Sequence, residues 1–240
     1  MPRFYAPAAQ WSGDRVWLDE AEGRHAVEVL RLKQGDPAVL FDGAGRVAAA
    51  RFVVAGKRRV EAEIVELKQA AAPSGRTTLV QALPKGKLFE WILEKAVELG
   101  VSRVVPLLTE RTVVQLEGSE RERKREKWER VVIEACKQCG QNWLPEVSLP
   151  VTLPLFLKEL PSPASIVASL HLGALPLKTV LPPNLSGDAL IFVGPEGDFT
   201  PVEMERIVSW GASPVTLGNI VLRVETAALV CMSVLGHLRG

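Results

Sequence analysis

The sequence predicts an α/β protein of two domains, a small and mainly β domain followed by a larger domain with a parallel sheet. Three observations support this prediction. The chain has 240 residues, which is long for one ordinary domain and sufficient for two cores. A small, flexible and proline-broken segment occupies residues 68–76, as expected of an interdomain linker. The residue pattern changes there from short strands separated by turns to alternating strands and helices.

The segment before Pro73 has the pattern of short β-strands. An apolar run at 39–41 ends in Asp42-Gly43-Ala44-Gly45, whose glycines favour a tight hairpin. A second strand is expected over 46–54. Residues 59–66 partly alternate polar with apolar side chains, which is typical of a half-exposed strand. We therefore predict a mainly β domain over residues 1–72.

Residues 73–240 alternate between strand and helix patterns, which predicts a parallel sheet. The helices are expected at 88–99, where Gly100 stops the apolar stripe, and from Ser119 to Gly140. A largely apolar helix is expected at the C-terminus. Strands are expected at 77–83, 101–108, 166–170, 189–193 and 214–218, and those at 166–170 and 189–193 are short apolar runs.

Composition excludes several classes of protein. No segment approaches the roughly 18 consecutive apolar residues that a bilayer span needs, so no contact with a membrane is expected. Residues 1–5 lack the apolar stretch of a secretory signal, and only three cysteines occur, which favours a cytoplasmic location. The formal net charge is +1, so binding of nucleic acid would require a local basic face.

Two stretches have a structural explanation that outweighs a functional one. Cys136-x-x-Cys139 matches a redox motif or half of a zinc site, but both sulfurs lie on the apolar stripe of the predicted helix. We favour core packing there and predict no metal site. The charged run at 120–130 contains pairs with helical spacing, such as Glu126 and Arg130, which favour a solvated helix face over an RNA contact.

The stretch 190–203 has the strongest local signal. A buried strand runs into Gly194-Pro195-Glu196-Gly197, and a helix follows with Thr200 as N-cap and Glu203 closing a capping box. Glycines at the carboxyl end of a parallel strand allow the backbone to approach a ligand. The stretch matches neither a Walker loop nor GxGxxG. Local physics alone supports a structural turn and a ligand-binding loop equally.

A second glycine junction follows at 214–218. Arg223 and Glu225 then stand at the start of the terminal helix, which is largely apolar. Charged groups at the entrance to a buried helix normally pair with each other or meet a ligand. We therefore favour a functional role for Arg223 and Glu225.

At these junctions the sequence resembles the ribosomal RNA small-subunit uracil-N3 methyltransferase family (RsmE) of the SPOUT superfamily. Several separate motifs occur in the same order along nearly the whole chain, which is more specific than one glycine turn. The motifs are Arg3-Phe4-Tyr5, His25, Val29-Leu30-Arg31, Phe41-Asp42-Gly43, Lys85-Gly86, Trp91, Glu94-Lys95-Ala96, Glu98-Leu99-Gly100-Val101, Glu110-Arg111, Gln138-x-Gly140-x-Asn142, Val193-Gly194-Pro195-Glu196-Gly197, Leu217-Gly218 and Leu222-Arg223-Val224-Glu225-Thr226-Ala227-Ala228.

The resemblance implies a PUA-like RNA-binding β-barrel over 1–72 and, over 73–240, a SPOUT domain with a parallel sheet and a trefoil knot. It also implies a homodimer that uses S-adenosyl-L-methionine to methylate N3 of one uridine in 16S ribosomal RNA, as free RNA or in the small ribosomal subunit. The residues that it implies for the cofactor are Leu170, Gly194, Pro195, Glu196, Gly197, Leu217, Gly218, Ile220 and Leu222. Those implied for RNA are Arg3, His25, Arg31, Lys85 and Arg111.

The chemistry of that reaction suggests roles for two residues. Uracil N3 becomes a nucleophile only as its proton leaves. Arg223 is therefore expected to stabilise the negative charge on the uracil oxygens, with Glu225 orienting that arginine or accepting the proton. The alternatives are another RNA position or a ribose 2′-hydroxyl as acceptor, and a non-catalytic RNA-binding assembly factor.

Three positions depart from the family pattern. Asp198 stands where a second glycine is usual, Val224 where threonine is usual, and Gln141 where arginine is common. Asp198 adds negative charge beside the expected cofactor loop, near a helix N-terminus that favours an anion. Val224 removes a hydroxyl, and Gln141 removes a possible phosphate contact.

Overall fold

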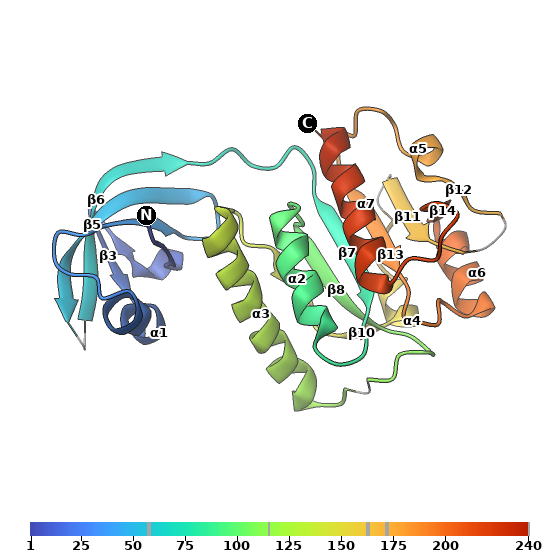
Figure 1. Ribbon diagram of the computed structural model, residues 1–240, viewed down its shortest axis with the longest axis horizontal. Helices are drawn as coiled ribbons and strands as arrows, with labels where there is room; N and C mark the ends of the chain where they lie inside the picture. Colours follow the sequence, from blue (N-terminus) through green and yellow to red (C-terminus); the bar gives the residue numbers. More distant parts are fainter. Residues whose placement is uncertain (57–58, 115, 162–163, 171–172, 240) are drawn as a thin grey trace. The chain divides into compact units, whose positions relative to one another are not determined.

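The computed structural model describes residues 1–56, 59–114, 116–161, 164–170 and 173–239 (Figure 1). The chain forms two compact units. The first consists of Met1–Ala72 together with Cys136–Leu144, and the second of Pro73–Ala135 together with Pro145–Gly240. The first junction falls within the proline-broken segment at 68–76 of the sequence. The inclusion of Cys136–Leu144 in the first unit depends on contacts between residues distant in sequence.

The first unit is built on one curled six-stranded sheet in the order β1-β4-β5-β6-β3-β2, in which β1 and β2 are edge strands, so the sheet is not closed into a barrel. Neighbouring strands are antiparallel except for β1 and β4. Its elements are β1 (Arg3–Tyr5), η1 (Ala8–Gln10), β2 (Trp11–Ser12), β3 (Arg15–Leu18), α1 (Glu20–Arg24), η2 (His25–Val29), β4 (Pro37–Phe41), β5 (Arg46–Gly56) and β6 (Arg59–Gln69).

Turn chemistry and apolar packing explain this sheet. The Asp42 carboxylate accepts hydrogen bonds from the amides of Ala44 and Arg46 at 2.7 and 3.0 Å, which fixes the predicted hairpin between β4 and β5. The core between the strands and α1 contains the side chains of Phe4, Leu40 and Phe52, all nearly inaccessible to solvent. The predicted mainly β architecture is confirmed.

Residues 136–144 join the first unit through backbone and side-chain contacts. The amide of Leu144 donates to Gly43 O at 2.8 Å, and the Trp143 indole donates to Ala71 O at 3.0 Å. The ammonium of Lys137 lies 2.8 Å from the Glu22 carboxylate, and both side chains are nearly buried. Gln141, one of the departures from the family pattern, accepts from the next two backbone amides. The β unit therefore holds this segment, which begins in the last turn of the helix Ser119–Cys139.

The second unit contains an eight-stranded sheet whose neighbouring strands are all parallel. The order is β10-β8-β7-β13-β11-β14-β12, with β9 also beside β8. The strands are β7 (Thr77–Ala82), β8 (Arg103–Leu108), β9 (Glu146–Val147), β10 (Val151–Thr152), β11 (Ala164–Ala168), β12 (Leu175–Pro176), β13 (Ala189–Val193) and β14 (Ser213–Thr216). The parallel sheet that alternation predicted is confirmed.

Helices cover both faces of this sheet, which is why every residue of β13 is buried. On one face, α4 and α6 pack against Phe192, whose ring meets Phe156 and Trp210 edge to face or nearly so. Helix α7 contacts α2 and the strands β7 and β13. The helices are α2 (Leu88–Glu98), α3 (Ser119–Cys139), α4 (Leu153–Phe156), α5 (Leu177–Val180), α6 (Pro201–Trp210) and α7 (Val224–Arg239).

Several strands begin or end at residues other than those predicted, and β11 is the clearest case. The run expected as a strand over 166–170 forms β11 at Ala164–Ala168, and the amide of Ser169 still donates to Val215 O at 3.0 Å. Leu170 has left the sheet and is 62% exposed. The shift matters because it places Leu170 in a loop at the edge of the sheet.

The two cysteines of the Cys-x-x-Cys motif occupy different environments. Cys136 is buried, and burial raises the pKa of its thiol to about 12, so this thiol stays protonated at neutral pH. Cys139 is exposed. Across the described ranges, no three His, Cys, Asp or Glu side chains are grouped as a metal site requires. None of the described helices combines the length and the apolar character needed to cross a bilayer.

Candidate functional site

A cavity of about 490 Å³ opens at the carboxyl edge of the parallel sheet in the second unit. Its walls come from the ends of β11, β13 and β14 and the residues that follow them, together with the starts of α2 and α7. Parallel strands bring their carboxyl ends to one edge, and open α/β sheets bind ligands there. The volume falls within the range of small-molecule sites. This cavity is therefore the candidate site.

The cavity contains most of the residues expected at the cofactor and the reaction centre. The predicted residues that line it are Leu170, Gly194, Pro195, Glu196, Leu217, Gly218, Ile220, Leu222, Arg223 and Glu225. Gly197 is predicted but does not line it. The lining residues that sequence reasoning did not assign to the site are Leu88, Ala168, Ser169, Val193, Asp198, Thr216, Val221, Val224 and Ala227. Most of these residues stand close in sequence to one of the two glycine junctions, and that position could have indicated them.

The loop after β13 is folded tightly on itself. The amide of Asp198 donates to Pro195 O at 2.9 Å, and the Asp198 carboxylate accepts from the amide of Phe199 at 2.7 Å. A Cβ added to Gly194 would lie 3.1 to 3.3 Å from atoms of Asp198 and Phe199, which is closer than ordinary contacts. Asp198 has a φ of +61°. Glycine adopts this left-handed conformation without strain, and aspartate is one of the few other residues that tolerate it, so the substitution suits the loop.

The helix that follows begins with the predicted capping box, which is confirmed. Thr200 Oγ1 accepts from the amide of Glu203, and the Glu203 carboxylate accepts from the amide of Thr200 at 3.0 Å. The second carboxylate oxygen of Glu203 accepts from the amide of Glu110 at 2.9 Å. Glu203 therefore links α6 to the segment after β8.

The loop after β14 uses a conformation available mainly to glycine. Gly218 has a φ of +129°, and its amide and carbonyl both contact the hydroxyl of Thr216. Ile220 and Val221 follow, and these residues are 78% and 72% exposed. The carbonyl of Arg223 accepts the first helical bond of α7, from Ala227, at 2.9 Å. Arg223 therefore caps the N-terminal end of α7, where Glu225 lies in the first turn.

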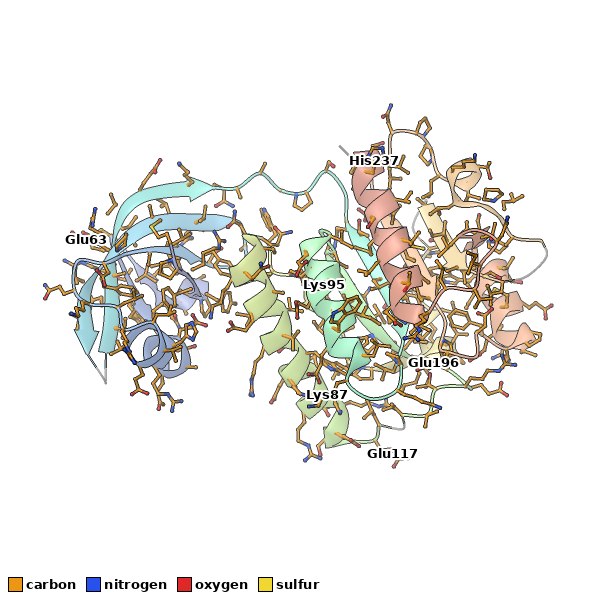
Figure 2. The ribbon with its side chains drawn as sticks, viewed as in Figure 1. Glu63, Lys87, Lys95, Glu117, Glu196 and His237 are labelled. Carbon is orange, nitrogen blue, oxygen red and sulfur yellow. The ribbon has the colours of Figure 1, made fainter. Side chains whose placement is uncertain are left out.

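The charges around the cavity are unequal. Three carboxylates line it, from Glu196, Asp198 and Glu225, against one guanidinium from Arg223. Arg223 is exposed and Glu225 half-buried, and no ion pair joins these two described residues within 4 Å. Figure 2 shows Glu196 near the N-terminal end of α7. An apolar wall with surplus negative charge suits a ligand that carries both an apolar surface and a cation.

The predicted RNA residues fall into both units. In the second unit, Lys85 donates its backbone amide to the Glu196 carboxylate at 3.0 Å, and the Arg111 guanidinium donates to Gly197 O. In the first unit, Arg3 donates to the Asn142 side chain at 2.8 Å, and burial lowers the pKa of its guanidinium. None of the five residues predicted to bind RNA lines the cavity.

The other two RNA candidates lie around an irregular helical segment of the first unit. His25 begins the π-helical turn η2, and its ring meets Phe4 edge to face at 6.2 Å. Arg31 is exposed and has a φ of +57°, which is uncommon for arginine. Strained turns and π-helical segments occur often at functional sites.

Comparison with known proteins gives two family matches. A model described as an RNA methyltransferase domain matches residues 71–236, and one described as an RNA methyltransferase PUA domain matches residues 18–65. Among curated relatives, ribosomal RNA small subunit methyltransferase E of a Synechocystis species is 33% identical over 232 residues, which cover 93% of this chain and 73% of the relative. The protein of the same name from Mycobacterium tuberculosis is 31% identical over 240 residues, covering 98% and 91%.

Two solved structures match the entire fold. Ribosomal RNA small subunit methyltransferase E from Neisseria gonorrhoeae, bound to S-adenosyl methionine, has a TM-score of 0.88 and 33% identity, covering 98% of this chain and 96% of its own. A methyltransferase from Legionella pneumophila, also with bound S-adenosyl methionine, has a TM-score of 0.89 and 32% identity, covering 97% and 96%. These matches extend over both units.

Proposed function

This chain belongs to the family of ribosomal RNA small subunit methyltransferase E, and on that premise we propose that it uses S-adenosylmethionine to methylate N3 of a specific uridine in 16S ribosomal RNA. The observation that carries the proposal is the cavity at the carboxyl edge of the sheet, whose two glycine loops meet beside Arg223 and Glu225. The bound cofactor in two relatives of the same fold supports the choice of methyl donor.

The residues present fit that cofactor. S-adenosylmethionine carries a sulfonium and an ammonium cation beside an apolar adenine. The surplus carboxylates of the cavity, from Glu196 and Asp198, would favour the cations. Residues of the two loops, 194–198 and 217–222, would hold the rest through backbone groups and apolar side chains. The cavity volume of about 490 Å³ suits a molecule of this class.

When bound, S-adenosylmethionine supplies an electrophilic methyl group. Uracil N3 attacks such a carbon only as its own proton leaves, and the resulting negative charge spreads onto the two uracil oxygens. Among the described residues that line the cavity, only Arg223 has a cationic side chain. We assign to Arg223 the stabilisation of that charge. The N-terminal end of α7, with its partial positive charge, adds to the effect.

Glu225 then has two possible tasks, and the geometry favours one of them. Orienting Arg223 would require a direct contact, and these two residues form no ion pair. A half-buried carboxylate that lines the cavity can instead accept the N3 proton. We therefore propose Glu225 as the general base. Holding both reactants in one cavity supplies much of the remaining rate.

The substrate is bound as RNA whose target base is unpaired, because N3 of a paired uracil is engaged in a hydrogen bond. We propose that Arg3, His25 and Arg31 contact RNA from the first unit, and that Lys85, whose amide bonds to the lining residue Glu196, contacts it beside the cavity. Exposed apolar side chains at the rim, including Ile220 and Val221, support a homodimer whose second subunit covers them. Light scattering of the purified protein measures that state.

The direct test is methyl transfer from labelled S-adenosylmethionine to small ribosomal subunits that lack the modification. Nucleosides from digested RNA are then identified by mass spectrometry. We expect N3-methyluridine at one position. Appearance of 2′-O-methylribose or of another methylated base would replace the acceptor that we propose. Cofactor binding without any transfer, to subunits or to free RNA, would instead favour an RNA-binding assembly factor.

The charge of Asp198 is expected to contribute modestly to cofactor binding. Asp198→Asn keeps a side-chain acceptor for the amide of Phe199 and a residue that tolerates the left-handed backbone. Only the negative charge is lost. Because an exposed charge pair contributes about 0 to 1 kcal/mol, we expect cofactor affinity to fall about 2- to 4-fold. Calorimetry at low and high salt measures this, and an effect that does not shrink with salt would contradict an electrostatic cause.

A further inference from the structure

A short turn after β8 stands against the outer side of the loop 194–198. The amide of Thr112 donates to Thr109 O at 3.1 Å, and the amide of Thr109 donates to Thr112 Oγ1 at 3.0 Å. The two threonine hydroxyls also bond to one another at 2.8 Å. Four residues are thereby closed into a compact turn with Glu110 and Arg111 at its tip. We call residues 109–112 the threonine turn.

The threonine turn is anchored by a buried carboxylate that the reaction does not use. Glu203 is only 7% exposed. One of its oxygens accepts from the amide and hydroxyl of Thr200 at 3.0 and 3.2 Å, and the other accepts from the amide of Glu110 at 2.9 Å. A carboxylate that accepts three hydrogen bonds in a buried position holds its donors firmly. Glu203 therefore fixes the turn to the start of α6.

From this anchored turn, Arg111 reaches the cofactor loop. Its guanidinium donates to the carbonyl of Gly197, and a Cβ at Gly197 would lie 3.3 Å from Cδ of Arg111. Gly194, Pro195, Glu196 and Asp198 line the cavity, whereas Gly197 does not. The one residue of this loop that lies outside the lining is therefore the one that Arg111 holds.

We propose that Glu203 and Arg111 form a brace that sets the shape of the loop 194–198 and thereby the affinity for the methyl donor. The inference rests on the proposed function, because it takes the cavity as the cofactor site. It assigns Arg111 to positioning the cofactor loop, in contrast to the RNA contact that the sequence resemblance implies. Glu203 acts through the threonine turn and is likewise a positioning residue. A loop held in its binding shape loses less conformational entropy when the ligand binds.

The first experiment separates loop positioning from RNA binding. We expect Arg111→Ala to weaken S-adenosylmethionine binding about 10-fold by calorimetry and to raise the KM for this cofactor, with kcat and RNA affinity changed less than about 2-fold. Arg111→Lys, which keeps one donor, should recover part of the affinity. Arg206→Ala removes an exposed arginine from α6 and serves as the control. Loss of RNA affinity with unchanged cofactor affinity in Arg111→Ala would overturn the proposal.

The second experiment tests the anchor. In Glu203→Gln, an amide nitrogen replaces one carboxylate oxygen and cannot accept a hydrogen bond. Either the amide of Glu110 or the amide of Thr200 then loses its acceptor. Thr200→Ala removes the cap hydroxyl but leaves the hydrogen bond between Glu203 and the amide of Glu110. This variant therefore shows the effect of a weakened α6 N-cap alone. We expect Glu203→Gln, but not Thr200→Ala, to weaken cofactor binding by about the factor seen for Arg111→Ala.

A double variant shows whether Glu203 and Arg111 contribute to the same restraint on the loop. The combined Glu203→Gln and Arg111→Ala change should weaken cofactor binding no more than about 2-fold beyond Arg111→Ala, because both remove the same restraint. Fully additive losses would overturn the brace. If Glu203→Gln does not fold, the Arg111 variants decide the question. Failure of the unaltered protein to bind S-adenosylmethionine would count against the proposed function, whereas normal binding by Arg111→Ala would count against the brace alone.

Discussion

Replacing Arg223 by alanine is expected to lower turnover about 100- to 1000-fold, with cofactor affinity changed less than about 3-fold. The reason is that removal of one preorganised donor to a developing anion costs about that factor in other enzymes. Arg223 is the only cation among the described lining residues, so no neighbour in the cavity can replace it. Single-turnover methylation of the RNA and calorimetry with the cofactor measure the two quantities separately.

Arg223→Lys is the matched control for this prediction. Lysine keeps the positive charge but loses the planar fork that can reach two acceptors, so we expect an intermediate loss of turnover. Equal losses of turnover and cofactor affinity in Arg223→Ala would show that the arginine shapes the cofactor site. The role in stabilising the uracil anion would then be wrong.

Gly218→Ala is expected to weaken cofactor binding about 10- to 100-fold. Gly218 has a φ of +129°, and a Cβ there would meet no described atom within 4 Å, so the effect comes from the backbone alone. Holding a residue other than glycine in a sparsely populated conformation costs about 1 to 3 kcal/mol. We expect the loop to move to relieve this strain. Because the loop lines the cavity, that movement changes the shape of the cofactor site. Calorimetry and thermal unfolding measure affinity and stability together.

Gly211→Ala provides a control with nearly the same backbone conformation. Gly211 follows α6 with a φ of +121°, and its added Cβ would make only ordinary contact with Pro161 at 3.5 Å. It does not line the cavity. We expect a similar loss of thermal stability and a change in cofactor affinity below about 2-fold. Comparable losses of affinity in both variants would mean that general destabilisation, and not the shape of the loop, explains the result.

Local rules determined much of this protein from the sequence. An apolar run gave the buried strand β13, because a strand covered on both faces has little room for polar side chains. The capping box of Thr200 and Glu203 was also predictable, since it depends on residues three apart. The two glycine junctions identified most of the cavity lining for the same reason. These are properties of short segments, which periodicity and turn chemistry describe well.

Contacts between distant residues were decided only by the tertiary structure. The bond from Glu203 to the amide of Glu110 joins residues 93 apart, and the bond from Arg111 to Gly197 joins residues 86 apart. The attachment of residues 136–144 to the β unit, through Trp143, is of the same kind. A hydrogen bond leaves no periodic signal in the sequence when its partners come from separate strands of a parallel sheet. Such partners meet only when the sheet order β8-β7-β13 brings their loops to one edge.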